Sequence, residues 1–402
     1  MMRALYVDID LVQLNPSGTY FPQLIETAVP NVHFYGPGFS SPDVLAKGLL
    51  PYIRETGPYD VVFIGPNSPI LVSELDDDVI RNTLHYMRRF TVHEHTDLQI
   101  VAFMQDLFAA LPKVDIEHRI VTSLNFDYYA ATAAQVQRLH DLNLTLIGPN
   151  EQFVRPFADL PKFVLQEKHY QRKKARLTDC WFDFLHAHPE RVITAVHYVV
   201  PSEFSQTPLH LRRPVVAVPG VEYHLRRRAN AELRRSAVRT ASKWYFHLFR
   251  ILNRFGIPVY ANPTGLHIYN QSFQRTLKTS RYVYTAPGGF GLPVRKFFEI
   301  PAAGALFLCR PCNGYQDLGF VDGVHYLSAE PDDLPGLLNE LARSGAGHDV
   351  AVSGRKVAAN NHSLQARAQQ IRLCLDALTQ GTYRGARWHQ GKFVLAQQGC
   401  AA

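Results

Sequence analysis

Residues 292–308 read Leu-Pro-Val-Arg-Lys-Phe-Phe-Glu-Ile-Pro-Ala-Ala-Gly-Ala-Leu-Phe-Leu. Pro293 favours the first turn of a helix, and Gly304 favours its end. The apolar run 305–308 that follows is typical of a short central strand in a parallel sheet. The stretch therefore predicts a short helix that carries a single acid, Glu299, directly before a buried strand.

A loop rich in glycine precedes this helix, Pro287-Gly288-Gly289-Phe290-Gly291. The backbone N–H groups of such a loop and of the helix N-terminus would face a phosphate group. A carboxylate at Glu299 is then well placed to hold a pair of sugar hydroxyl groups. The alternative is a surface glutamate on a packing helix, and only the strands around the segment favour the functional interpretation.

The composition describes an ordinary globular protein with a basic charge. The chain has 402 residues, of which 46% are hydrophobic and 19% charged, and its formal net charge is +7. This length favours two domains. The positive charge favours anionic partners: a nucleotide, a phosphorylated substrate, an acidic glycan or a membrane surface. Nucleic acid is not expected, because no basic motif interleaved with aromatic residues is found.

The sequence predicts a cytoplasmic location. Asp8 and Asp10 interrupt the first apolar run, so no signal-peptide core is expected. No apolar run approaches the length of a membrane span. The five cysteines are odd in number and scattered, which fits reduced thiols.

Short apolar runs that end in Gly, Pro or Asn recur along the first half of the chain. Segments with helical character, such as 131–142 and 178–186, separate most of them. This alternation predicts a parallel sheet with helices on both faces. The expected strands are 4–9, 32–36, 60–65, 98–104, 119–124, 144–148 and 191–199.

The pattern starts again after a polar, proline-punctuated join at 202–213. A long helix is expected at 231–255, with Leu233, Ala237, Trp244, Leu248 and Leu252 on one face and Gly256 at its end. Five further strands are expected at 215–218, 258–260, 281–285, 305–308 and 325–327.

Two such sheets predict an α/β protein of two Rossmann-like domains with a cleft between them. The N-terminal domain is expected at 1–205 and the C-terminal domain at 212–378. An amphipathic helix at 364–378 is expected to lead into a tail, 379–402, that crosses back to the first domain. Trp388, Phe393 and Val394 in this tail favour docking.

Four stretches carry a family resemblance: 218–227 (Val-Pro-Gly-Val-Glu-Tyr-His-Leu-Arg-Arg), 295–304, 314–323 and 362–367. In order and spacing they resemble the C-terminal domain of glycosyltransferases with the GT-B fold, most closely the group named for the spore maturation protein CgeB. In the first half only Gln105-Asp106 is similar to that group.

The resemblance implies a nucleotide-sugar donor in the C-terminal domain and an acceptor in the N-terminal domain. The acceptor could be a glycan, a lipid-linked molecule, a protein or a small molecule. The resemblance also implies retention of configuration at the anomeric carbon. In related retaining enzymes two glutamates lie eight positions apart. Here Glu299 fits the second, but Gly291 stands at the position of the first.

The resemblance implies that Glu299 binds the two ribose hydroxyl groups. An ionised carboxylate can accept a hydrogen bond from each of them. Cations and N–H dipoles would take up the charge that develops on the leaving diphosphate. Arg226 or Arg227, after the Gly220 turn, and Lys296 are the expected cations, and Gly291 is the expected loop glycine. The alternative for the arginines is a solvated, basic helix start.

Two tyrosines and one aspartate have two interpretations each. Tyr223 and Tyr315 either contact the nucleotide or pack in the core. Asp106 follows the expected strand 98–104, at a sheet edge where catalytic groups gather. It would act as base for the acceptor hydroxyl or stabilise the cationic sugar, or else it caps a helix over 107–111.

No cofactor or metal is expected. Cys309-Arg310-Pro311-Cys312 lacks the second ligand pair that a zinc site needs. Asp8 and Asp10 are explained by alternation in a first strand. The basic cluster 172–176 is interpreted as a solvated helix face, with an acidic acceptor or peripheral contact with lipid headgroups as the alternative.

These features leave three candidate functions. The leading hypothesis is a retaining glycosyltransferase. The second is a nucleotide-sugar epimerase of the same two-domain architecture, and the third is a non-catalytic module that binds a nucleotide sugar.

Overall fold

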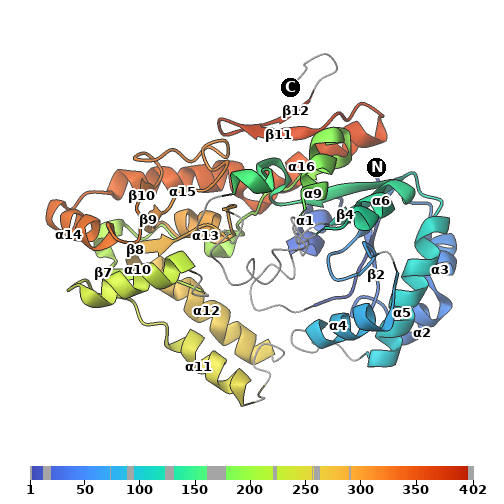
Figure 1. The fold of residues 1–402 in the computed structure, drawn as a ribbon, viewed down its shortest axis with the longest axis horizontal. Helices are drawn as coiled ribbons and strands as arrows, with labels where there is room; N and C mark the ends of the chain where they lie inside the picture. Colours follow the sequence, from blue (N-terminus) through green and yellow to red (C-terminus); the bar gives the residue numbers. More distant parts are fainter. Residues whose placement is uncertain are drawn as a thin grey trace.

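The computed structural model describes residues 2–11, 20–72, 74–87, 95–122, 131–160, 178–220, 224–255, 257, 263–288 and 291–396. Figure 1 shows two lobes, each built on a parallel sheet flanked by helices. The first lobe holds a sheet of six strands and the second a sheet of four.

The strands of the first sheet are parallel and lie in the order β2-β1-β3-β4-β5-β6. β1 and β3 are wholly buried, as expected for strands covered on both faces. Their bounds are β1 (Ala4–Val7), β2 (Val32–Tyr35), β3 (Val61–Ile64), β4 (His118–Thr122), β5 (Leu144–Gly148) and β6 (Val192–Thr194). Six of the seven strands predicted here are confirmed.

The helices of this lobe are α1 (Tyr20–Ala28), α2 (Pro42–Lys47), α3 (Leu49–Thr56), α4 (Asp77–Met87), α5 (Asp97–Ala110), α6 (Ala133–Asp141) and α9 (Cys180–Ala187). The predicted strand 98–104 is wrong, because it lies inside α5. Thr96 and Gln99 form a capping box at its start. Ile100, Phe103 and Met104 then recur at helical spacing and are buried.

The second sheet is also parallel, in the order β10-β9-β8-β7. Its strands are β7 (Arg213–Ala217), β8 (Ser280–Thr285), β9 (Leu306–Cys309) and β10 (Leu327–Ser328). The strand predicted at 325–327 begins two residues later than expected, and the one predicted at 258–260 lies outside the described residues.

The long helix predicted at 231–255 is two helices, α10 (His224–Arg235) and α11 (Trp244–Arg254). Between them the chain runs beside β7, where Val216 N donates to Arg239 O and Ala241 N donates to Val216 O. This pairing interrupts the helical bonding. The predicted apolar face is therefore wrong, since Leu233 is buried whereas Trp244 and Leu248 are exposed.

The remaining elements are α12 (Pro263–Thr279), α13 (Lys296–Ala302), α14 (Leu334–Ser344), α15 (His348–His362), α16 (Leu364–Thr379), β11 (Ala386–His389) and β12 (Lys392–Leu395). α13 begins after Pro293, contrary to expectation, and Gly304, at a φ of 71°, follows its end as expected. Among the described residues, no helix has both the length and the apolar character needed to span a membrane.

The chain returns to the first lobe through α16. Val199, after β6, pairs with the start of this helix: its N donates to His362 O, and its O accepts from Leu364 N. Ile371 and Leu375 pack in one core with residues of α1 and β1. The crossing of the C-terminal helix is therefore confirmed.

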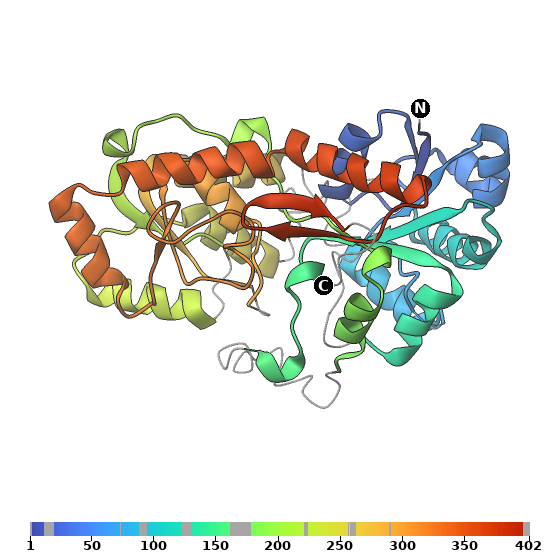
Figure 2. The same cartoon turned by 90° about the horizontal axis from the view of Figure 1, so that it is seen from above.

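The antiparallel hairpin β11–β12 completes this return (Figure 2). Trp388 is 2% exposed, and its backbone N and O both pair with the side-chain amide of Gln152 in the first half of the chain. The predicted docking of Trp388 is confirmed, whereas Val394 is exposed.

We predict that Ile371→Ala lowers the free energy of unfolding by about 2–5 kcal/mol, because it leaves a cavity between α16 and the first lobe. Leu373 lies on the same helix but is 48% exposed. Leu373→Ala should therefore change stability by only about 0.5 kcal/mol. Urea denaturation measures both, and equal effects would contradict the packing of α16 on α1.

Candidate functional site

A cavity of about 300 Å³ lies at the carboxyl ends of β7 and β8. Its lining comes from four parts of the chain: the linker at 200–203, Gly220 after β7, α12, and the first turn of α13 with Arg295 before it. In open α/β sheets, ligands bind outside the carboxyl ends of the strands. The volume is at the lower end of the range of small-molecule sites.

Glu299 lines this cavity from the first turn of α13. It is 4% exposed, and its neighbours Phe297, Phe298 and Ile300 are fully buried. Its Oε1 accepts a hydrogen bond of 2.8 Å from Arg295. The surface-glutamate alternative is therefore wrong, since Glu299 is a buried carboxylate at the wall of the cavity.

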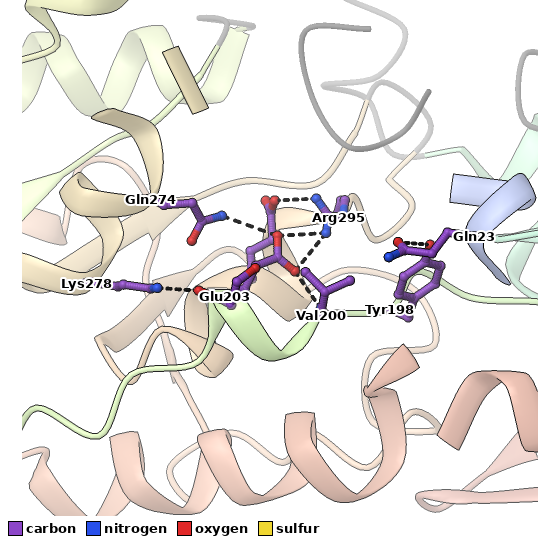
Figure 3. A network of polar contacts seen from close by, with 9 residues as sticks. Gln23, Tyr198, Val200, Glu203, Gln274, Lys278 and Arg295 are labelled. Carbon is purple, nitrogen blue, oxygen red and sulfur yellow. Dashed lines mark hydrogen bonds and ion pairs between the residues drawn. The ribbon is translucent and has the colours of Figure 1, made fainter. Parts of the chain in front are cut away.

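Arg295 bridges Glu299 to a second buried carboxylate, Glu203. Figure 3 shows Arg295 beside Glu203. One Arg295 nitrogen donates to both oxygens of Glu203, at 2.7 and 2.8 Å, and another donates to Glu299. We refer to these residues as the Glu203–Arg295–Glu299 triad. It joins the linker between the two sheets to the helix that carries Glu299.

Further contacts hold Glu203 in place. Val200 N donates to its Oε2 at 2.8 Å, and Gln274 of α12 donates to its Oε1 at 3.3 Å. Burial raises the pKa of Glu203, and Glu299 adds to this, although Arg295 opposes it. Burial alone would lower the pKa of Arg295, but the two carboxylates raise it above its usual value. Two carboxylates around one guanidinium leave the triad with one net negative charge.

Two cations also lie at the cavity, around Gly220. This glycine has a φ of 82°, and a Cβ there would lie 2.8 Å from Cε of Lys296 and 3.2 Å from Arg226. A larger residue would meet the ends of both cationic side chains, and the positive φ also favours glycine at this position. We call them the Lys296–Arg226 pair.

Burial, together with repulsion from Arg226 and Arg295, lowers the pKa of Lys296 to about 8. Arg226 is buried in the first turn of α10 and donates to Pro219 O at 3.4 Å. Two cations held side by side match the charge and dimensions of a diphosphate better than those of a neutral ligand.

The other predicted arginine, Arg227, lies on the exposed side of α10, and its neighbour Arg228 pairs with Asp332 on the surface. Of the predicted donor residues, the cavity thus brings together Glu299, Lys296 and Gly220, with Arg226 behind Gly220. Tyr223 lies outside the described residues, as does the basic cluster 172–176.

Gly291 and Tyr315 do not line the cavity. Gly291, at a φ of 74°, accepts a backbone bond from Asn313 and shapes the loop before α13. Tyr315 is 1% exposed, donates to Phe297 O at 2.7 Å and stacks on Phe320 with ring centroids 4.4 Å apart. The structure therefore supports core packing for Tyr315 and not the predicted nucleotide contact.

Asp106 lies away from the cavity, inside α5. Its Oδ2 accepts a hydrogen bond of 2.7 Å from Leu49 N, and Gly48 packs against its carboxylate. It therefore caps the start of α3. The predicted strand end does not exist, and the predicted cap of 107–111 is also wrong, because α5 is continuous there.

The sheet of the first lobe has its own topological switch point, the place where ligands bind in open α/β sheets. It lies at β1, between β2 and β3, where the strand order reverses. Asp8 follows β1 and is buried, which raises its pKa to about 7. Asn67 and Ser68, after β3, donate to its oxygens at 3.0–3.1 Å. β1 ends at Val7, so strand alternation does not explain Asp8, which instead holds the loop after β3.

Sequence reasoning missed the role of Arg295 and Glu203. Arg295 was part of a recognised segment but had no assigned partner, and Glu203 is 92 positions away in the linker. Among the described residues, no group of three or more His, Cys, Asp or Glu side chains is arranged to hold a metal ion.

The Cys309-x-x-Cys312 segment lies at the end of β9 and beyond it, and both thiols are free. Burial raises the pKa of both cysteines well above the ordinary value. The structure therefore fits the interpretation of this segment as a strand end with free thiols.

No protein-family model matches the sequence, and no curated protein matches it. Solved structures resemble the fold at low identity. A glycosyltransferase from Rickettsia africae is 12% identical over 94% of this chain and 98% of that chain, with a TM-score of 0.50. Sucrose-phosphate synthase from Thermosynechococcus elongatus is 10% identical over 95% and 100%, with a TM-score of 0.49.

HepE from Anabaena, crystallised with UDP and glucose, is 10% identical over 94% of this chain and 100% of that chain, with a TM-score of 0.46. At these identities the likeness concerns the fold alone. The two parallel sheets, their crossover helix and the likeness to the Rickettsia structure show the predicted fold class, an α/β protein of GT-B architecture.

We predict that Arg295→Met lowers the free energy of unfolding by about 3–5 kcal/mol at neutral pH, because it leaves two carboxylates buried without their cation. Burial already raises the pKa of Glu203, and the variant lacks the cation that opposes this shift, so protonation of Glu203 restores stability as the pH falls towards 5. Urea denaturation at both pH values tests this. Arg228→Met, which breaks a surface pair, is the control and should change stability little.

Proposed function

We propose that this protein is a glycosyltransferase that moves a sugar from a nucleotide-sugar donor to an acceptor hydroxyl group, with retention of configuration and without a metal ion. One observation carries the proposal. At the carboxyl ends of β7 and β8, a single cavity has the buried carboxylate of Glu299 in its wall and the Lys296–Arg226 pair at Gly220. The four sequence segments that resemble CgeB-like enzymes support the finer family assignment.

In this proposal the donor spans the cavity. Glu299 accepts hydrogen bonds from the ribose hydroxyl groups, with Arg295 holding its carboxylate in place at 2.8 Å. The diphosphate lies at Gly220, where a glycine leaves room and Lys296 supplies charge. When the bond to the sugar breaks, this charge stabilises the diphosphate that leaves, which is the task a metal ion performs in other enzymes.

The acceptor is proposed to bind in the first lobe, within the predicted domain 1–205, and the donor within 212–378. Closure of the lobes would bring them together and exclude water. The acceptor class stays open among glycans, lipid-linked molecules, proteins and small molecules. The linker that carries Glu203 forms part of the wall of the proposed donor cavity. Donor binding and movement of the lobes would therefore both act on the contact between Glu203 and Arg295.

The function is tested by thermal unfolding with UDP, GDP and ADP, followed by incubation of the best donor nucleotide sugar with candidate acceptors. The proposal predicts a raised melting temperature and a glycoside product whose anomeric configuration, measured by NMR, matches that of the donor. An epimerised donor formed without acceptor would favour the epimerase. Binding without any turnover would favour a non-catalytic module, and the absence of any stabilisation contradicts all three hypotheses.

We predict that Glu299→Gln weakens binding of the preferred ribonucleoside diphosphate about 10- to 100-fold, because an amide replaces a charged acceptor. Isothermal titration calorimetry measures this. The 2′,3′-dideoxy analogue isolates the ribose contact, since the substitution should cause no further loss with it. Glu330→Gln, at an exposed position, is the matched control. An equal loss with both nucleotides contradicts the ribose contact.

We predict that affinity for the nucleoside diphosphate falls as the pH rises above about 8. The pKa of Lys296 is lowered to about 8 in the unliganded protein, and a bound diphosphate would raise it. Binding above that pH then requires proton uptake, which costs up to about tenfold in affinity per pH unit. Isothermal titration calorimetry between about pH 7 and 9.5, in buffers of different ionisation enthalpy, measures both the affinity and the number of protons taken up. Lys296→Met should bind more weakly at pH 7 and lose the pH dependence.

A further inference from the structure

One long stretch of the second lobe is entirely free of acidic residues. Between Leu233 and Phe298 the sequence has no Asp or Glu. The basic residues of this stretch are Arg234, Arg235, Arg239, Lys243, Arg250, Arg254, Lys278, Arg275, Arg281, Arg295 and Lys296. α11 lies within it, on the side of the molecule opposite α16 (Figure 1).

α11 exposes a stripe of large apolar side chains. Trp244, Leu248, Ile251 and Phe255 are 53%, 42%, 51% and 76% exposed, and Ile257 just beyond is 49% exposed. The first four follow the spacing i, i+4, i+7 and i+11, which places them on one side of the helix. A contiguous apolar stripe of this kind on a soluble protein marks an interaction surface.

The rest of the helix surface divides into two sectors. Tyr245 and Phe249 are buried against Tyr269 of α12, with edge-to-face ring contacts. His247, Arg250 and Arg254 are exposed. At about 100° per residue, His247 and Arg254 fall beside the apolar stripe, and Arg250 lies further round the same side, about 130° from the centre of the stripe. An apolar face flanked by arginines, with an aromatic residue at its edge, is the pattern of helices that lie in a membrane interface.

A second cavity, of about 540 Å³, continues this surface beyond Trp244. Arg213, Arg275 and Lys278 contribute to its lining, as does Leu211, which is 69% exposed. No carboxylate belongs to the described residues that line it. The positive charge and exposed apolar groups therefore extend from α11 onto the neighbouring face of the lobe.

We propose that the exposed stripe of α11, with its arginine flank, docks on the surface of an anionic lipid bilayer. The apolar stripe would enter the interface while Arg250 and Arg254 meet acidic headgroups. A second copy of the chain fits this surface less well, since like charges would face each other. A convex helix at the edge of the lobe matches the plane of a bilayer better than a partner that needs a groove (Figure 1).

This inference goes beyond the proposed function and does not depend on it. The two surfaces are nevertheless adjacent, because Tyr269, on which α11 packs, also lines the candidate donor cavity. Docking through α11 would hold that cavity close to the membrane.

The test is co-sedimentation of the full chain with two kinds of vesicle. One kind is phosphatidylcholine alone, and the other is phosphatidylcholine and phosphatidylglycerol at a molar ratio of about three to one. The proposal predicts binding to the anionic vesicles that weakens with added salt. Trp244 supplies a local probe, because the other two tryptophans, Trp181 and Trp388, are buried. Its fluorescence should shift to shorter wavelength on binding, and Trp244→Phe should remove the shift.

Variants separate the two parts of the surface. Leu248→Gln with Ile251→Gln should lower vesicle affinity at least about tenfold, through lost apolar burial. Arg250→Ala with Arg254→Ala should lower it by about 30-fold on anionic vesicles, since each basic group near such a surface contributes about a fivefold factor. Leu98→Gln, at an 81% exposed position on α5, is the matched control and should bind like the parent.

Thermal unfolding of each variant confirms that the fold is retained. The proposal is overturned if the protein binds neither kind of vesicle, or if the Leu248/Ile251 double variant binds the anionic vesicles as tightly as the parent does. It is equally overturned if light scattering shows a dimer that this double variant converts to a monomer, because a second copy then covers α11.

Discussion

The bridge that Arg295 forms between Glu203 and Glu299 is the interaction on which the candidate site depends. It fixes the carboxylate of α13 at the wall of the candidate donor cavity and ties it to the linker between the two sheets. Each glutamate would be costly to bury alone, and a single guanidinium with several donors satisfies both. One side chain therefore positions the proposed ribose contact and holds the junction of the lobes.

The residues around the cavity carry charges of both signs. The triad carries one net negative charge, whereas the Lys296–Arg226 pair at Gly220 is positive. This polarity suits a nucleotide, whose ribose donates hydrogen bonds and whose diphosphate is anionic. Gly220 has no Cβ, which leaves room for the ends of both cationic side chains beside the backbone, and its positive φ favours glycine there. The buried face of α11 packs against Tyr269, so the same cavity borders the proposed membrane surface.

Local patterns predicted most of the fold. The strands β1, β5, β8 and β9 were evident as short apolar runs, and the restart near residue 215 indicated a second sheet. Errors came where two local signals compete. The run 98–104 is apolar enough for a strand, but the capping box at Thr96 and Gln99 begins a helix. The helical pattern 231–255 is interrupted by backbone pairing with β7, a partner that no local periodicity reveals.

The sequence by itself determined the alternation of strands and helices, the glycine turns and the short helix that carries Glu299, because these depend on neighbours a few positions apart. Only the tertiary structure decided that Glu203 joins Arg295, that Tyr315 packs in the core, that Asp106 caps α3 and that Trp244 faces solvent. The physical reason is distance along the chain. Ion pairs, caps between helices and burial depend on how remote segments come together in space, and the pattern of any one segment does not contain that information.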